Sequence, residues 1–292
     1  MRLIAYSSIT PEAILQSVTS VSGGKTSAYM ALHYPTDHYV FACVLTEHKG
    51  SISRDKALIR ECQNRIPHFV ASHEDDRTLR VVLELEQELG KEIKWVAAEF
   101  VLEDFVQGST DLPGYRSGKP RLFNSLTRFC TVQQKIIPIA AYCHNFVDGI
   151  EPVLMNLGFR YDEPQRVENW NCKNDRYRMA LSCPVNGGNW KYTETEWRIS
   201  DFPLYRDRIV NADIRAFWQK KGWDFPEVSN CRFCPFHSDF QLQLQAQEHP
   251  KNLDWWMQLE SQTGHTFGKR ALTDRINQPL LDIFDSPCAC TD

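Results

Sequence analysis

The sequence predicts an α/β fold in which helices flank a parallel sheet. Runs rich in β-branched and aromatic residues, at 17–21 and 38–45, alternate with runs of helical composition, and a glycine pair follows the first of them. This alternation is typical of parallel sheets, because each helix returns the chain to the end of the sheet where the next strand begins. With 292 residues, of which 42% are hydrophobic, the chain can bury one large core and add a smaller unit.

Each element is expected from its own residues. The strand at 17–21 ends at Gly23 and Gly24, a helix runs through 28–32, and the strand at 38–45 completes a βαβ unit. The further expected elements are a helix at 56–65, a strand at 68–71, a helix at 77–90, a helix at 125–146 and a strand at 152–158. This order predicts a Rossmann-like sheet.

The pattern changes near residue 168, where Trp, Asn, Tyr and Cys become frequent and the elements become short. We therefore expect two units, a sheet-bearing unit at 1–167 and a smaller, irregular, cysteine- and tryptophan-rich unit at 168–292. The segment 108–123 combines turn-forming residues with cations and is a candidate lid over a polar site.

Composition excludes several classes of protein. A net charge of −4 and a pI near 6.2 leave no general basic field that attracts nucleic acid. No stretch approaches the ~18 apolar residues of a membrane span, so we expect a cytoplasmic protein without a membrane partner. Ten cysteines without an export signal favour metal or redox chemistry over a disulfide framework.

A glycine turn separates the first strand from the first helix. Because glycine lacks Cβ, backbone N–H groups can approach a phosphate there, and the positive end of the helix points to the same place. A Walker A loop is excluded, because Thr19 stands where its first glycine is required. The candidate nucleotide-binding residues of this turn are Ser22, Gly23, Gly24, Lys25, Thr26 and Ser27.

A second polar turn follows the strand expected at 152–158 and contains Arg160, Asp162, Glu163 and Arg166. Ligands of open α/β sheets bind outside the carboxyl ends of the strands. Guanidinium groups fork onto phosphate or sulfate oxygens, and a carboxylate can accept a ribose hydroxyl or hold Mg²⁺. These four residues are further candidate ligands of the nucleotide. The alternative is an exposed turn held by its own salt bridges.

The cysteines fall into two groups. Cys231 and Cys234 form a Cys-x-x-Cys turn, which suits two thiolate ligands of an iron–sulfur cluster or of zinc, with a redox dithiol as the alternative. Cys43, Cys62 and Cys143 lie in apolar patterns, and we expect them in the core.

Four blocks in order along the chain carry a family resemblance. They are Ser-Gly-Gly-Lys-Thr-Ser at 22–27, Arg128-Phe129-Cys130-Thr131 with Lys135 and Pro138, the Gly-Phe-Arg-Tyr-Asp-Glu-Pro-x-Arg run at 158–166, and Asn230-Cys231-x-x-Cys234 with Pro250 and Trp255-Trp256. Together they resemble the phosphoadenosine phosphosulfate (PAPS) reductase family of the PP-loop ATP pyrophosphatases (adenine nucleotide alpha hydrolases), most of all its phage and prophage members.

The resemblance implies a PP-loop (HUP) sheet in the first unit that binds ATP, PAPS or adenosine phosphosulfate (APS), with Mg²⁺ as a further ion. It also implies Cys130 as a third metal ligand beside Cys231 and Cys234. We take Cys290 in the terminal segment as the fourth, with Cys288 and Cys183 as alternatives. A [4Fe–4S] cluster is the preferred metal group, and zinc is the alternative.

The resemblance implies an enzyme that transfers or reduces a sulfur or adenylyl group, with a sulfur- or electron-donor protein as partner. Lys25, Arg160 and Asp162 are the candidate catalytic residues. The glycine turn and Arg160 would stabilise the negative charge that develops on phosphoryl or sulfonyl oxygens. One alternative is an ATP-dependent tRNA or DNA thiolation enzyme, which the interleaved tryptophans and cations of the second half favour. The other is a non-catalytic nucleotide-binding module, because Thr26 stands where many relatives carry aspartate.

Overall fold

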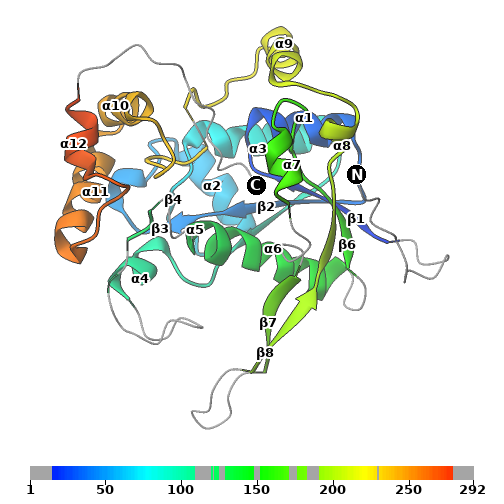
Figure 1. Cartoon of the computed structure of the whole chain (residues 1–292), viewed down its shortest axis with the longest axis horizontal. Helices are drawn as coiled ribbons and strands as arrows, with labels where there is room; N and C mark the ends of the chain where they lie inside the picture. Colours follow the sequence, from blue (N-terminus) through cyan, green and yellow to red (C-terminus); the bar gives the residue numbers. More distant parts are fainter. Residues whose placement is uncertain are drawn as a thin grey trace.

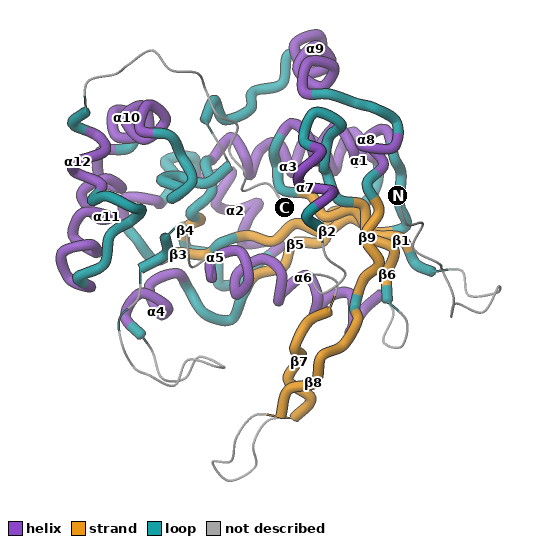
Figure 2. Tube along the Cα trace, viewed as in Figure 1, coloured by secondary structure: helices purple, strands orange, loops and turns teal. Residues whose placement is uncertain are grey.

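A computed structural model describes residues 15–108, 120, 122–124, 129–147, 152–170, 176–182, 191–228 and 230–278. At its centre lies a five-stranded sheet with the strand order β5-β2-β1-β6-β9, and every pairing in it is parallel (Figures 1 and 2). The strands are β1 (Ser17–Val21), β2 (His38–Cys43), β5 (Ile93–Ala97), β6 (Val153–Asn156) and β9 (Arg198–Asp201). The predicted α/β class with a parallel sheet is confirmed.

Both faces of the sheet are covered, as parallel sheets require. Successive side chains of β2 point to opposite faces: Phe41 packs with the helices α1, α2, α3 and α9, and Val40 packs with α6 on the other side. In Figure 1, α1 and α3 lie above the strands and α5 and α6 below them. These helices are α1 (Lys25–His33), α2 (Lys56–Arg65), α3 (Asp76–Leu89), α5 (Phe129–Thr131), α6 (Ile137–Tyr142) and α9 (Asn211–Lys221).

A third core cluster lies at the end of the sheet where β2 leaves it. Val44 packs there with Phe233, Trp256 and residues of α4, α10, α11 and α12. Figure 1 shows α10 to α12 gathered beside the short β3–β4 pair. The elements are β3 (Leu45–Thr46), β4 (Ala71–Ser72), α4 (Leu102–Gln107), α10 (Asp239–Glu248), α11 (Pro250–Thr263) and α12 (Leu272–Ile276).

Smaller elements complete the described chain. The antiparallel β7–β8 hairpin projects away from the main sheet (Figure 2). The bounds are a 3₁₀ turn at Lys49–Ser51, α7 (Pro164–Glu168), β7 (Arg176–Ser182), β8 (Lys191–Glu196) and α8 (Pro203–Arg206). No described helix has the length and apolar character that crossing a membrane requires.

The structure differs from the sequence expectations in several elements. The prediction of a strand over 68–71 is wrong. The chain makes a tight turn there, in which the Phe69 N–H donates to the carbonyl of Ile66. Only Ala71 and Ser72 form a strand, which pairs antiparallel with β3. In addition, β9 pairs with β6, so the main sheet takes strands from both sides of residue 167.

The helix expected at 125–146 is described from residue 129 to 147, and it contains two π-helical turns, Val132–Ile136 and Cys143–Val147. Pro138 has no N–H to donate to the carbonyl of Gln134, and the wider turn before it accommodates the proline ring.

Candidate functional site

The two polar turns predicted from the sequence leave neighbouring strands. The glycine turn follows β1, the turn with Arg160 follows β6, and these strands pair in parallel, so both turns lie at the same edge of the sheet. From β1 the chain proceeds to β2 and β5 in one direction, whereas β6 and β9 lie in the other direction. The carboxyl ends of β1 and β6 therefore flank the topological switch point, which is where open α/β sheets bind ligands.

The glycine turn is held by its own hydroxyl groups. Ser27 Oγ accepts the Ser22 N–H at 3.0 Å and lies 2.9 Å from Ser22 Oγ. Gly23 has a φ of +75°, and a Cβ there would lie 2.5 Å from Thr78 Cγ2, so only glycine fits. Gly24 caps α1 without a side-chain hydrogen bond to the first N–H groups, which leaves the positive end of this helix available to an anion.

Asn230 lies directly against this turn. Its Nδ2 donates to the carbonyl oxygen of Ser22 at 2.9 Å, and a Cβ on Gly24 would lie 3.1 Å from both polar atoms of the Asn230 amide. The space that glycine leaves at position 24 therefore receives Asn230. Because Asn230 precedes Cys231, this contact joins the glycine turn to the Cys-x-x-Cys segment.

Lys25 and Thr26 point to different neighbours. The Lys25 ammonium lies 5.9 Å from the centre of the Phe225 ring, and burial lowers its pKa, with a further lowering by the charge of Arg215. Thr26 Oγ1 accepts from Arg160 Nη1 at 3.4 Å. The glycine turn and the arginine turn thus meet through Thr26, whereas the Lys25 side chain extends toward the segment after α9.

The arginine turn is an ion-paired cluster. Arg160 is only 7% exposed, and its Nε and Nη2 lie 2.9 Å from Asp162 Oδ1 and 3.2 Å from Glu163 Oε1. Arg166 shares Glu163 Oε1 at 3.2 Å and stacks 4.2 Å from the centre of the Phe159 ring. An incoming phosphate or sulfate would have to share these guanidinium groups with the carboxylates. Asp162, whose side chain is 38% exposed and also accepts the Asn211 N–H at 3.3 Å, is the more exposed of the two partners.

Three of the four predicted metal ligands line one pocket. Cys130, Cys231 and Cys234 meet in a small cavity of about 50 Å³, although 100 residues of sequence separate the first from the second. Its other lining residues are Val44, His73, Leu102, Phe123, Asn124, Thr131, Lys135, Phe233, Pro235, Phe236 and Trp256. Cys290, with its alternatives Cys288 and Cys183, lies outside the described residues.

An ion pair between a partly buried lysine and a fully buried carboxylate lies beside the cysteines. Lys135 Nζ is 3.0 Å from Glu74 Oε1 and 3.8 Å from Cys231 Sγ, and Glu74 is fully buried. Burial alone would lower the pKa of Lys135, but Cys231 and Glu74 outweigh it and raise the pKa, so the ammonium stays charged. Burial raises the pKa of Cys130, and the Lys135 charge offsets part of that rise.

The spacing of the three sulfurs bears on the kind of metal. A tetrahedral zinc ion with Zn–S bonds of about 2.3 Å holds its thiolates about 3.8 Å apart. In the described part of the chain, the three cysteine sulfurs do not all lie within 4.8 Å of one another. An iron–sulfur cluster takes its thiolates on different iron atoms, so its ligands lie farther apart.

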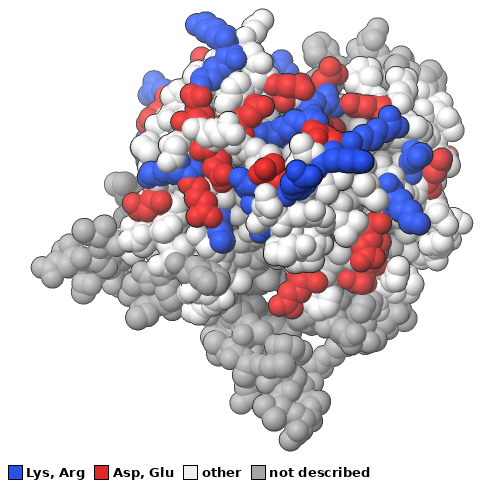
Figure 3. All heavy atoms as spheres, turned by 180° about the vertical axis from the view of Figure 1, so that it is seen from behind, with Lys and Arg blue, Asp and Glu red and all other residues white. Residues whose placement is uncertain are grey.

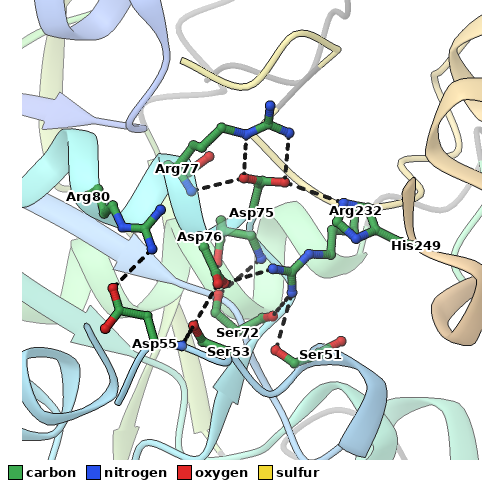
Figure 4. A network of polar contacts seen from close by, with 12 residues as sticks. Ser51, Ser53, Asp55, Ser72, Asp75, Asp76, Arg77, Arg80, Arg232 and His249 are labelled. Atoms are coloured by element: carbon green, nitrogen blue, oxygen red, sulfur yellow. Dashed lines mark hydrogen bonds and ion pairs between the residues drawn. The ribbon is translucent and has the colours of Figure 1, made fainter. Parts of the chain in front are cut away.

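The Cys-x-x-Cys segment is anchored by backbone and side-chain contacts to the start of α3. Glu74 and Cys231 form a β-bridge, and the Asp75 N–H donates to the carbonyl of Asn230 at 2.8 Å. Arg232, only 6% exposed, reaches Asp76 at 2.8 Å (Figure 4). The cysteine turn is therefore held between the glycine turn and the polar network of α3.

A second group of possible metal ligands is Asp75, Glu248 and His249, whose ligand atoms lie within 4.8 Å of one another. Arg77 already contacts both carboxylates, at 2.9 Å from Asp75 Oδ1 and 2.7 Å from Glu248 Oε1 (Figure 4 shows its pair with Asp75). A guanidinium between the carboxylates neutralises the charge that a cation would need. This cluster ties α3 to the junction of α10 and α11.

Other predicted side chains are part of the core. Cys43, Cys62 and Cys143 are buried, as expected. Trp197, Trp218 and Trp256 are at most 4% exposed, which takes them out of reach of a stacked base. On the face turned away in Figure 1, Lys and Arg side chains are interleaved with Asp and Glu rather than gathered by sign (Figure 3). These features give little support to a nucleic-acid substrate.

Asn230, Glu74 and His73 were not assigned a role from the sequence. Asn230 stands inside a quoted block, but its contact with Ser22 depends on how the second half of the chain folds back. Glu74 and His73 follow the two-residue strand β4, where the sequence predicted only a strand end. The one signal in the sequence was an acidic residue, Glu74, shortly after a strand end.

No protein-family model matches this chain, and no curated protein matches it significantly. The class that the described structure defines is an α/β protein whose five-stranded parallel sheet brings a glycine turn and an arginine turn together at its switch point. Beside these turns lies the cysteine pocket, in which Cys234 is buried and Cys130 and Cys231 are partly exposed.

Proposed function

We propose that this chain is an adenine-nucleotide-binding enzyme of the PP-loop class, similar to the PAPS reductases, that transfers or reduces a sulfur or adenylyl group. The observation that carries the proposal is the contact of Asn230 with Ser22, because it places the cysteine turn next to the glycine turn. A nucleotide site and a thiolate site in contact are what chemistry at a phosphosulfate requires.

The nucleotide would lie over the switch point, with its phosphates or sulfate against the start of α1. The first N–H groups of α1 and the Arg160 guanidinium would stabilise negative charge that develops on the phosphoryl or sulfonyl oxygens. Asp162 would exchange its contact with Arg160 for a ribose hydroxyl or Mg²⁺. Arg166, stacked on Phe159, adds a second cation at the same turn.

The cysteine pocket would hold an iron–sulfur cluster, which supplies electrons or a site for sulfur. Cys130, Cys231 and Cys234 would be its ligands in their thiolate form. The Lys135 ammonium, 3.8 Å from Cys231 Sγ, would balance thiolate charge, and aromatic side chains such as Phe233 and Trp256 would keep water away.

Calorimetric titration tests the nucleotide half of the proposal. ATP, PAPS, APS and adenosine are titrated into the wild type, Arg160→Ala and a matched control, Arg206→Ala. Arg206 pairs with Asp201 at the end of β9 and is more than half exposed. Arg160→Ala should weaken the charged nucleotides at least tenfold and leave adenosine unchanged. Equal losses for both kinds of ligand would assign Arg160 to folding.

Turnover and metal content test the remaining half. Sulfite release from PAPS or APS, and pyrophosphate or AMP release from ATP, are measured on anaerobically purified protein. Binding without turnover would favour the non-catalytic module. A preparation without iron, zinc or sulfide would contradict the metal centre and leave the nucleotide site standing.

A further inference from the structure

His73 is a buried imidazole in the wall of the cysteine pocket. It lines the same cavity as Cys130, Cys231 and Cys234, and it is 7% exposed. Its Nδ1 is enclosed and has no hydrogen-bond partner among the described residues. Buried ring nitrogens are nearly always paired, so an unpaired one beside three thiols points to a missing partner.

The backbone fixes His73 between the sheet and the cysteine turn. Its N–H donates to the carbonyl of Val44 at 2.8 Å, and its carbonyl accepts the N–H of Arg232 at 2.9 Å. The ring packs against Trp256, with 5.4 Å between centroids and 68° between planes. An imidazole held on both sides in this way is positioned before any ligand arrives.

The surroundings keep this imidazole neutral. Burial foremost, and then the charges of Arg232 and Lys135, lower the pKa of His73 to about 3, with smaller contributions from His48 and His237. A neutral imidazole has a lone pair to offer a metal and carries no charge that would repel one.

We propose that His73 is the fourth protein ligand of the metal centre that Cys130, Cys231 and Cys234 hold. The inference rests on the proposed metal centre and deepens it, because it replaces the terminal cysteine of the sequence prediction with a residue of the pocket wall. Three thiolates and one imidazole carry one negative charge fewer than four thiolates. Exchange of thiolate for imidazole raises the reduction potential of an iron–sulfur centre.

The experiment compares five forms of the full chain after anaerobic reconstitution with ferrous iron and sulfide. They are the wild type, His73→Ala, His73→Cys, the double variant Cys288→Ser/Cys290→Ser, and His48→Ala. His48 is the matched control, because it stacks on Trp255 outside the cysteine pocket. Iron and sulfide are counted per chain, and the reduced centre is examined by pulsed electron paramagnetic resonance for hyperfine coupling to directly bound ¹⁴N.

We expect equal iron and a ¹⁴N coupling in the wild type, the tail double variant and His48→Ala. His73→Ala should lose at least half of its iron. His73→Cys should keep its iron, lose the ¹⁴N coupling and shift to a lower reduction potential. If His73→Ala does not fold, as judged by circular dichroism, His73→Cys with its spectroscopic readout decides.

Two results overturn the inference in different ways. Full iron in His73→Ala together with loss of iron in the tail double variant would assign the fourth ligand to a terminal cysteine, and the proposed metal centre would stand. A wild type that takes up no iron and no sulfide would contradict the iron–sulfur centre itself, and the His73 assignment would fall with it.

Discussion

The sheet edge that carries the glycine and arginine turns and the cysteine pocket are built in different ways. The glycine and arginine turns leave two paired strands, so the sheet alone brings them together, and their charged groups are in part exposed. The cysteine pocket is assembled from the end of β2, the residues between β4 and α3, the helix at 129–147 and the segment at 230–236, and the carboxylate of its ion pair is fully buried. The first site depends on strand order, whereas the second depends on many long-range contacts.

The comparison teaches that one segment couples the two regions. Asn230 contacts the glycine turn, and the residue after it, Cys231, lies beside Lys135 in the pocket. Substitutions in the cysteine pocket should therefore lower the free energy of unfolding more than substitutions at the sheet edge with the glycine and arginine turns. Four predictions test this difference.

The largest effect is expected at the buried ion pair. Glu74→Leu leaves the Lys135 ammonium without its partner and should lower the free energy of unfolding of the metal-free protein by about 3–5 kcal/mol. Urea denaturation measures this loss. The double variant Glu74→Leu/Lys135→Met should recover only part of it, because the Val44 N–H and the Ser72 hydroxyl still lack the carboxylate that accepts from them. Glu88→Ala, which removes a surface pair with Lys221, should cost no more than about 0.5 kcal/mol. A loss of similar size in Glu88→Ala would contradict the special role of the buried pair.

The next effect is expected at the glycine turn. Gly23→Ala combines a φ of +75° with a Cβ 2.5 Å from Thr78 Cγ2, so it should cost about 3 kcal/mol. Gly222→Ala is the matched control, because φ is +70° but a Cβ meets nothing within 4 Å, and it should cost about 1 kcal/mol. Thermal and urea unfolding of both variants measure these losses. Equal losses of the free energy of unfolding would show that the Thr78 side chain moves to accommodate the new Cβ.

A third effect is the pH dependence that His73 contributes. Its pKa in the fold is about 3, against 6.5 in the unfolded chain, so below pH 6.5 the unfolded state takes up a proton that the folded state does not. Stability should therefore fall as the pH falls, by about 1.6 kcal/mol between pH 6.5 and 5 in the metal-free protein. His73→Gln should remove this slope, and an unchanged slope would place the titration at another group.

The smallest effect is expected at the contact between the two regions. Asn230→Ala removes one hydrogen bond to Ser22 and should cost about 1 kcal/mol. The same variant should weaken both nucleotide binding and iron retention, which calorimetry and iron analysis measure. An effect on one of the two alone would mean that the regions act independently.

The sequence predicted those parts of the fold whose signals are local. The bounds of β1 and α2 were expected as they are found, and α2 begins after Asp55, whose carboxylate accepts the N–H groups of Ala57 and Leu58. β5 and β9 were missed, because they are short and half-exposed, and they become strands only when paired.

The residues of the candidate site also divide into those with a local sequence signal and those without one. The glycine turn, the arginine turn and the Cys-x-x-Cys pair are visible as short motifs with their own chemistry. Glu74, His73 and Asn230 gain their roles from partners far away in sequence, and no local pattern predicts a partner that tertiary folding supplies. The reverse holds for Lys25. It belongs to the glycine-turn motif, but its side chain lies over Phe225, a position that the motif does not predict.

The strand order also sets the sequence of events in synthesis. Closing β6 against β1 forms a parallel pair across a very long loop, and such pairings form slowly. The glycine turn leaves the ribosome well before Arg160 and Asn230 are made, so the nascent chain presents the start of α1 without the residues that cover it. The main sheet is therefore completed when β9 has been made, and the contact of Asn230 with the glycine turn forms only later.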